Sequence, residues 1–185
     1  MSLILCLLML FSPEEKKKEL VTLPLPYDTL TNTLCIEQTI QLAHKINIDS
    51  TLDTISQAEV YLRSLNWFEL HFPSPKKVIQ NYSQPDSVTG KYKFRIYYIN
   101  PKTEVRNIIK YWIVYDIKFE CFNGQYKYII DNFRTDEATP QKIERWLTKD
   151  GKPKKEYIMY TNQLVEYLKE LEKSIIEKMK LSPSK

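Results

Sequence analysis

The most regular alternation of hydrophobic and polar residues lies between residues 91 and 99 and predicts a long β-strand. Every second residue is aromatic or aliphatic, which gives one apolar face: Tyr92, Phe94, Ile96 and Tyr98. The opposite face carries three bases and two further hydrophobic residues: Lys91, Lys93, Arg95, Tyr97 and Ile99. Shorter strands are predicted around residues 36–42 and at Val78-Ile79.

Residues 108–133 predict a β-hairpin that turns at Asn123-Gly124, a pair that accepts the positive φ values of a type I′ turn. A two-residue turn at this point places residues opposite each other when their numbers sum to 247. In that register the hydrophobic residues share one face, and Glu120 lies opposite Lys127 on the other face as a favourable charge pair. A shift of one residue would destroy both agreements, so the sequence predicts a single register.

Two longer helices are predicted, one before and one after these strands. The first begins at Ser56, because Ser56 and Glu59 can cap each other while Ile55 and Val60 occupy the positions of a hydrophobic staple. It ends before Pro73. The second helix is C-terminal, where an apolar residue recurs every three or four positions: Tyr160, Leu164, Leu168, Leu171, Ile175 and Met179.

The order of strand, helix, three or four antiparallel strands and helix predicts an α+β fold. We expect a curved antiparallel sheet with helices packed on one face. A single domain is expected over residues 35–181, after an extended segment over residues 13–34. Within the domain, Thr139-Pro140 predicts the start of a short helix that reaches Trp146-Leu147.

An apolar run from Leu3 to Phe11 precedes the domain. It is too short to span a bilayer, which needs about 20 residues, but its length matches the hydrophobic core of a secretory signal. The run lacks a preceding base and a following Ala-x-Ala cleavage site. We interpret residues 1–12 as a truncated signal segment and expect export to the periplasm or cell envelope. The alternative is an N-terminal strand or helix of a cytoplasmic protein.

Two cysteines, Cys35 and Cys121, lie outside this leader. In an exported domain they could form a disulfide, and the alternative is two separate buried thiols. The sequence alone does not place the two residues within bonding distance.

The composition excludes several classes of enzyme. The 185 residues include only three glycines, Gly90, Gly124 and Gly151, so no glycine-rich phosphate loop, dinucleotide fingerprint or nucleophile elbow is present. His44 and His71 stand in no catalytic motif, and no cysteine pair has the close spacing of a zinc site. We therefore predict a domain that is not an enzyme, with no catalytic, cofactor-binding or metal-binding residues.

One pair of acidic residues is still a candidate for chemistry. The hairpin register places Asp116 opposite Asp131. Adjacent carboxylates repel each other, so such a pair binds a cation, shares a proton or is neutralised by neighbouring bases. Lys110 and Lys118 share a face with Asp116 and could neutralise it. A hydrolase that uses the two aspartates is therefore the least favoured function.

Positive charge gathers in the second part of the chain. Residues 1–75 contain five Lys or Arg and nine Asp or Glu, whereas residues 76–185 contain 22 and 14, and the whole chain carries a net charge of +4. The polar face of the sheet combines bases with hydrophobic residues, and we take these as a candidate partner-binding face: Lys93, Arg95, Tyr97, Lys110, Trp112 and Ile129. This combination is typical of a nucleic-acid stacking surface, and also of a solvated sheet whose lysines prevent edge pairing.

Two stretches of the chain resemble a known bacterial family. They are Ile55-Ser56-x-Ala58-Glu59-x-Tyr61-Leu62-x-x-x-x-Trp67-Phe68 with Phe72 and Val78-Ile79, and the stretch from Tyr111-x-Ile113-x-Tyr115-x-Ile117 to Asn123-Gly124-x-Tyr126-x-Tyr128. Over about residues 36–135 the chain resembles the domain of unknown function 4468. The resemblance implies a TATA-binding-protein-like fold and a small exported protein of the bacterial envelope. It implies no activity, no catalytic residue and no promoter binding, because one fold serves many functions.

We therefore expect an exported, non-catalytic binding or accessory domain of the cell envelope, whose partner is a protein or an envelope ligand. The alternative is a cytosolic nucleic-acid-binding domain that uses the same basic and aromatic face. The sequence leaves the oligomeric state open.

Overall fold

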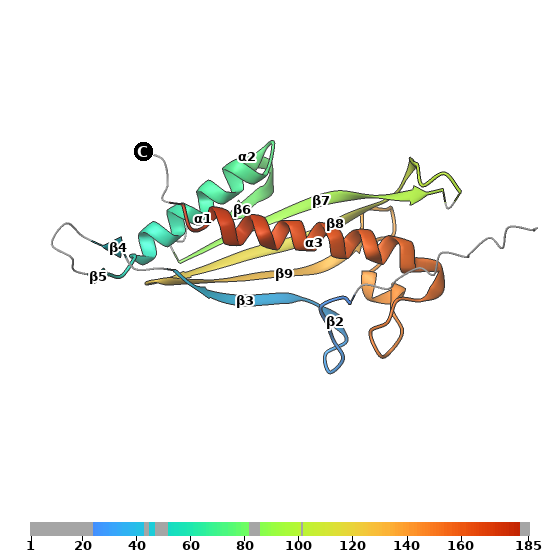
Figure 1. The fold of residues 1–185 in the computed structure, drawn as a ribbon, viewed down its shortest axis with the longest axis horizontal. Coiled ribbons are helices and arrows are strands. Elements are labelled where there is room, and N and C mark those ends of the chain that lie inside the picture. Colours follow the sequence, from blue (N-terminus) through green and yellow to red (C-terminus); the bar gives the residue numbers. More distant parts are fainter. Residues whose placement is uncertain (1–23, 43–44, 47–51, 82–85, 101, 182–185) are drawn as a thin grey trace, which may run out of the picture.

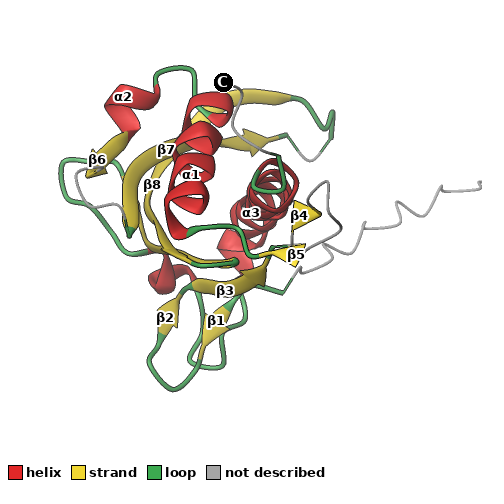
Figure 2. Ribbon diagram, turned by 90° about the vertical axis from the view of Figure 1, so that its left-hand side faces the viewer, coloured by secondary structure: helices red, strands yellow, loops and turns green. Residues whose placement is uncertain are grey.

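A five-stranded antiparallel sheet forms the centre of the computed structural model, which describes residues 24–42, 45–46, 52–81, 86–100 and 102–181 (Figure 1). The strand order is β3-β9-β8-β7-β6, with bounds Ile36–Gln41 for β3, Gln125–Thr135 for β9, Arg106–Phe122 for β8, Ser87–Ile99 for β7 and Ile79–Asn81 for β6. The sheet bends around helices α1 (Gln57–His71) and α3 (Ile158–Lys178), which lie on its concave side (Figure 2). The predicted α+β class, with helices on one face of a curved sheet, is confirmed.

The smaller elements differ from the predictions at two places. Residues 24–34 were expected to be extended, but they contain a hairpin of β1 (Tyr27–Asp28) and β2 (Thr33–Leu34). The predicted short helix from Thr139-Pro140 is wrong, because residues 141–142 are extended: Thr135 N–H donates to Gln141 O at 2.9 Å, and Arg134 bridges to Lys142. Only a single 3₁₀ turn follows. The remaining short elements are β4 (Lys45–Ile46), β5 (Leu52–Asp53), α2 (Pro75–Val78), η1 (Ile143–Trp146) and η2 (Lys155–Tyr157).

The register of the β8–β9 hairpin is as predicted. Asp116 pairs with Asp131 and Glu120 with Lys127. The predicted turn type is wrong, since a type I′ turn needs positive φ at both central residues and only Gly124 has it, at 71°. The tip of the hairpin is instead held by the start of α1. Gly124 N–H donates to Ile55 O at 2.7 Å, and Gln57 N–H donates to Asn123 Oδ1 at 2.8 Å.

Helix α1 begins as its sequence predicts. Glu59 N–H donates to the Ser56 side chain at 3.3 Å, and the helix ends at His71, two residues before Pro73. Tyr61 and Leu65 of this helix are only half-buried. The buried residues of the helix are Val60, Arg63, Ser64, Trp67 and Phe68.

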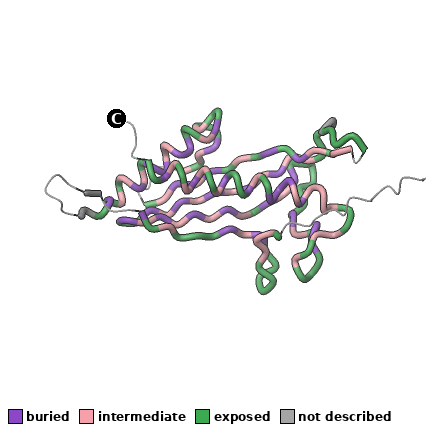
Figure 3. The backbone as a smooth tube through the Cα atoms, viewed as in Figure 1, coloured by how far each residue is buried: buried purple, intermediate pink, exposed green. Residues whose placement is uncertain are grey.

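The core lies between the concave side of the sheet and the two helices. Along β8 and β9, buried residues alternate with partly exposed ones, as expected for a sheet covered on one side only (Figure 3). Phe68 of α1 packs directly on the backbone of β7 at Gly90, where a Cβ atom would lie 2.4 Å from the ring. Glycine is therefore required there for close helix–sheet packing.

Helix α3 carries the apolar stripe that its sequence predicts. Leu164, Leu168, Leu171 and Ile175 are all buried against the sheet. The end of the helix is tied to α1, because the buried Arg63 side chain donates to the carbonyl oxygens of Met179 at 3.0 Å and Lys180 at 3.1 Å. These bonds satisfy carbonyl groups that a helix C-terminus leaves without intrahelical partners.

Candidate functional site

A cluster of two bases and an indole lies on the outer face of the sheet, where β7 and β8 pair. Arg95 pairs with Trp112 across the strands, and its Cζ lies 4.6 Å from the centre of the Trp112 ring. Lys93 Nζ lies 5.0 Å from the same centre and also donates to Asp136 at 2.6 Å. Cation–π attraction of this kind holds the bases against the ring.

Arg95 differs from Lys93 because it has no carboxylate partner among the described residues. Arg95 is exposed, and its guanidinium lies on the indole of Trp112. A guanidinium presents up to five donors in a planar fork that suits a carboxylate or phosphate. The cluster therefore offers one unpaired charge for an anionic group.

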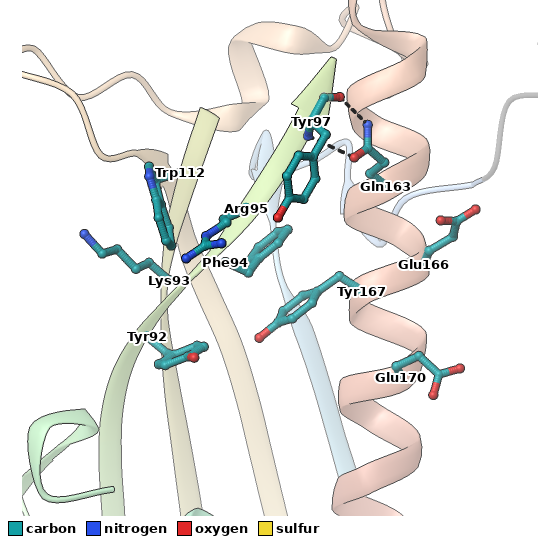
Figure 4. Close-up of a pocket in the computed structure, with 10 residues that line it drawn as sticks. All are labelled: Tyr92, Lys93, Phe94, Arg95, Tyr97, Trp112, Gln163, Glu166, Tyr167 and Glu170. Carbon is teal, nitrogen blue, oxygen red and sulfur yellow. Dashed lines mark hydrogen bonds between the residues drawn. The ribbon is translucent and has the colours of Figure 1, made fainter. Parts of the chain in front are cut away.

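The cluster forms one wall of a groove of about 560 Å³ between β7 and α3 (Figure 4). Aromatic side chains of the concave side form its base, where Phe94 and Tyr167 stack with their ring centres 3.8 Å apart. Helix α3 forms the other wall with one amide and two carboxylates. The lining residues are Tyr92, Lys93, Phe94, Arg95, Tyr97, Trp112, Gln163, Glu166, Tyr167 and Glu170.

Helix α3 also holds one end of the groove closed. Tyr97 N–H donates to Gln163 Oε1 at 3.0 Å, and Gln163 Nε2 donates to Tyr97 O at 2.8 Å (Figure 4). Deeper in, the hydroxyl groups of Tyr115 and Tyr167 lie 2.8 Å apart. Burial raises the pKa of both phenols, so both stay neutral at physiological pH. The phenol groups at the base of the groove are thus uncharged.

Four of the six residues of the candidate face lie together at this groove: Lys93, Arg95, Tyr97 and Trp112. Lys110 occupies a position of β8 that β7 skips, at a bulge, and its Nζ lies 5.5 Å from the ring of Tyr111. Ile129 lies elsewhere on the sheet, since it pairs with Lys118, six residues and about 20 Å along β8 from Trp112.

The contribution of α3 to the groove was not predicted from the sequence. Gln163, Glu166, Tyr167 and Glu170 follow one another at spacings of three, one and three residues, which places them along one side of a helix. This row runs beside the leucine stripe, so the sequence does carry its signal. The sequence does not indicate which strand this row of residues faces.

The Asp116–Asp131 pair lies on the outer face and has other neighbours than predicted. Asn132, with a φ of 56°, donates to Asp116 through its side chain, while Lys91 and Arg134 each lie 3.9 Å from Asp116 Oδ1. Burial, and then the charge of Asp116, raise the pKa of Asp131.

The bases that could neutralise Asp116 in the predicted register are engaged elsewhere. Lys118 donates to Glu120 at 2.6 Å, and Lys110 lies by Tyr111. In the part of the chain that the structure describes, no group of three or more His, Cys, Asp or Glu is placed to hold a metal ion. This arrangement favours a neutralised pair in the sheet.

Cys35 and Cys121 are both free thiols. Cys121 is fully buried under α1, where its Sγ lies 3.9 Å from Ser64 Oγ, whereas Cys35 is partly exposed. Burial raises the pKa of Cys121 to about 11 and also raises that of Cys35. Neither thiol is therefore activated as a nucleophile.

Comparison with known proteins bears on the family of the chain. Residues 47–136 match the family model described as "Domain of unknown function (DUF4468) with TBP-like fold". The predicted resemblance to this family is confirmed. The matched segment contains α1, β6, β7, β8 and β9, and so includes the cluster of Lys93, Arg95 and Trp112. No curated protein shows significant similarity to the chain.

Two solved structures share the fold. A TBP-like protein from Parabacteroides distasonis is 12% identical, with a TM-score of 0.60, over 82% of this chain and 96% of its own. A DUF4468 family protein from Bacteroides ovatus is 13% identical, with a TM-score of 0.58, over 83% of this chain and 90% of its own. These similarities extend beyond the family match and include most of the described chain.

The described helices include none that is both long and apolar enough to cross a membrane. The predicted leader at residues 1–12 lies outside the described residues.

Proposed function

We propose that this chain is an exported, non-catalytic binding or accessory domain of the bacterial cell envelope, which holds its partner at the groove between β7 and α3. The observation that carries the proposal is the exposed Arg95 guanidinium, which is held on Trp112 and has no carboxylate partner in the described residues. A positioned and unpaired charge beside stacked aromatic rings has the composition of a recognition site.

The non-catalytic part of the proposal is supported by the state of the other polar groups. Asp116 accepts a hydrogen bond from Asn132 and lies near two bases. Burial raises the pKa of both described thiols. The localisation is supported by the apolar run at residues 3–11.

Photo-crosslinking in cells that produce the protein tests the binding role. A photoreactive residue in place of Glu170, on the α3 wall of the groove, is expected to give a discrete crosslinked product. The same residue in place of Lys142, which does not line the groove, serves as the control. A product that is equal at both positions, or absent at both, would contradict the proposal.

Fractionation with N-terminal sequencing of the mature protein tests the localisation. Export predicts recovery from the envelope fraction and a new N-terminus near Ser12. An intact N-terminus in the cytoplasm would overturn the localisation without affecting the binding role.

A nucleic-acid-binding domain is the second candidate, because Lys93, Trp112 and Arg95 combine charge with a stacking surface. Other bases of the outer face are neutralised, since Lys118 pairs with Glu120 and Lys127 with Glu37. This function predicts oligonucleotide binding that weakens steeply with salt and is lost in Trp112→Ala. Binding that is absent at low salt would exclude it.

A further inference from the structure

The outer edge of β7 is open over a short window. On one side β7 pairs with β8 along its length, but on the other side β6 pairs only with Thr89 and Gly90. Beyond this point no described strand continues the sheet. The open edge extends from Lys91 to Ile96, which corresponds to about 20 Å of extended chain.

Helix α3 closes the edge after this window by imitating a strand. The Gln163 side chain makes both hydrogen bonds to the backbone of Tyr97, and Ile99 N–H donates to Met159 Sδ at 3.3 Å. The edge is therefore protected on both flanks, by β6 and by α3, and left unpaired only between them. Natural sheets usually block open edges, because an open edge pairs readily with another chain.

The bonds of Tyr97 and Ile99 also show which backbone groups face outward. Backbone groups of a strand point to its two edges in alternation, and the bulge beside Ile96 and Tyr97 adds its extra residue to β8. Odd-numbered residues of β7 therefore direct N–H and C=O outward. Lys93 and Arg95 are the two such residues along the groove, and in the described chain their backbone groups have no partner on this edge.

From this geometry we infer that β7 takes up an extended acidic peptide as an added strand. The inference rests on the proposed function and names the chemistry of its partner. Main-chain bonds to Lys93 and Arg95 would supply affinity, as in other cases of strand addition. Alternate side chains of the peptide point to opposite faces, so one row meets Arg95 and Trp112 and the other meets Phe94 and Tyr167.

The charges differ between the two sides of the window. The α3 wall carries the carboxylates of Glu166 and Glu170, which disfavour acidic side chains on the inner row of the peptide. A carboxylate on the outer row pairs with the guanidinium of Arg95, and an apolar side chain on the inner row covers the Phe94–Tyr167 stack. A second copy of this chain fits poorly, because edge-to-edge pairing of two β7 strands brings the Lys93 and Arg95 side chains of both copies onto the same face. Like charges on facing strands are destabilising.

The probe for this inference is a blocked eight-residue peptide in which aspartate and valine alternate. It is added to the full chain and followed by NMR and calorimetry. We expect saturable binding, and hydrogen exchange at the amides of Lys93 and Arg95 should slow at least tenfold. Arg95→Glu should weaken binding at least tenfold, and Arg145→Glu, an equal charge change at an exposed site outside the groove, less than twofold.

Backbone methylation of the peptide isolates the strand geometry. Methyl groups on the alternate nitrogens that face β7 should abolish binding, whereas methyl groups on the other nitrogens should leave it within threefold. Binding that is insensitive to the methylated edge, or absent altogether, would overturn strand addition. In the absence of peptide, the amides of Lys93 and Arg95 could also exchange more slowly as the protein concentration is raised. That result would assign the edge to a second copy of the chain and would also overturn the addition of a peptide strand.

The crosslink at Glu170 separates this failure from that of the proposed function. A discrete crosslinked partner together with no peptide binding would overturn strand addition alone. Loss of both the crosslink and the peptide binding would overturn the binding role as well.

Discussion

At the scale of single residues, the molecule depends on close contacts that α1 makes with the sheet, within itself and with α3. The Phe68 ring occupies the space over Gly90 that a side chain would fill, and Trp67 stacks on His71 with ring centres 4.8 Å apart. His71 also shares a hydrogen bond of 2.9 Å with Ser174 of α3. Each of these contacts leaves little free space, so small changes have measurable effects.

Gly90→Ala is expected to lower the free energy of unfolding by about 1–3 kcal/mol, because the new Cβ would overlap the Phe68 ring and force it to shift. Denaturant unfolding measures the effect. The double variant with Phe68→Leu should lose less stability than the sum of the two single changes, since the smaller side chain relieves the overlap. Strict additivity would show that the overlap is not the cause.

His71 should make the protein less stable as the pH falls from about 6.5 toward 4. Burial, and secondarily the charge of Lys178, lower the pKa of His71 from 6.5 to about 4. In this range the unfolded chain binds a proton that the folded chain does not, so unfolding is favoured. Above pH 6.5 the imidazole is neutral in both states and contributes no pH dependence.

Thermal unfolding at several pH values tests this expectation. The midpoint of His71→Gln should rise relative to that of the wild type between pH 7 and pH 4.5, since glutamine can still bond Ser174 but does not titrate. A constant difference between the two proteins over this range would show that the pKa of His71 is not lowered.

At the scale of elements, the ends of α1 and α3 are joined by two bases with different exposure. Arg63 is 4% exposed and donates to carbonyl groups at the end of α3, whereas Lys178 is only partly buried and donates to Leu70 O at 3.0 Å in a solvent-exposed bond. Arg63 also forms an ion pair of 2.7 Å with Glu59. The buried bonds should contribute more, because their loss leaves polar groups away from water.

Arg63→Met is therefore expected to lower the free energy of unfolding by about 1–3 kcal/mol. Lys178→Met, which removes an exposed bond between the same two helices, should cost less than about 1 kcal/mol. Chemical denaturation of both variants measures the difference. Equal losses would mean that the ends of the helices are held by packing alone.

At the scale of the whole molecule, the long central strands and the short peripheral hairpins differ in how much they bury. Strands β8 and β9 lie in the middle of the sheet and carry its buried aromatic residues, while β1 and β2 pair over only two residues. Regions with few buried contacts open locally, before the whole domain unfolds.

Native-state hydrogen exchange should accordingly separate two classes of amide. Amides that bond between β8 and β9 should exchange only through global unfolding, with a free energy that follows the stability of the whole domain. Amides of the β1–β2 hairpin should exchange faster and show little dependence on denaturant. Uniform protection of both regions would contradict this division.

The predictable part of the fold is the part determined by local pattern. The hairpin register follows from the apolar alternation around Asn123-Gly124, and the start of α1 follows from the Ser56 cap, because both depend on residues close in sequence. The turn type was wrong because a distant contact, from Gln57 to Asn123, holds the turn.

The candidate site was predicted only in part, for the same reason. Alternation along β7 places Lys93 and Arg95 on one face, and the pairing with β8 adds Trp112. The other wall comes from α3, about 70 residues later, and no local pattern indicates that Gln163 reaches the backbone of Tyr97. The unpaired window of β7 is bounded on one side by the end of the β6 pairing and on the other side by the bonds between Gln163 and Tyr97.

The position of β3 has a consequence for the time order of assembly. Its six residues pair with residues of β9 that lie 84 to 94 positions later in the chain. At a synthesis rate of about 5–20 residues per second, β3 waits on the order of 5–20 s before its partner has been made. The strand nearest the N-terminus of the central sheet is thus among the last to be paired. During synthesis, β3 therefore remains unpaired until β9 has been made.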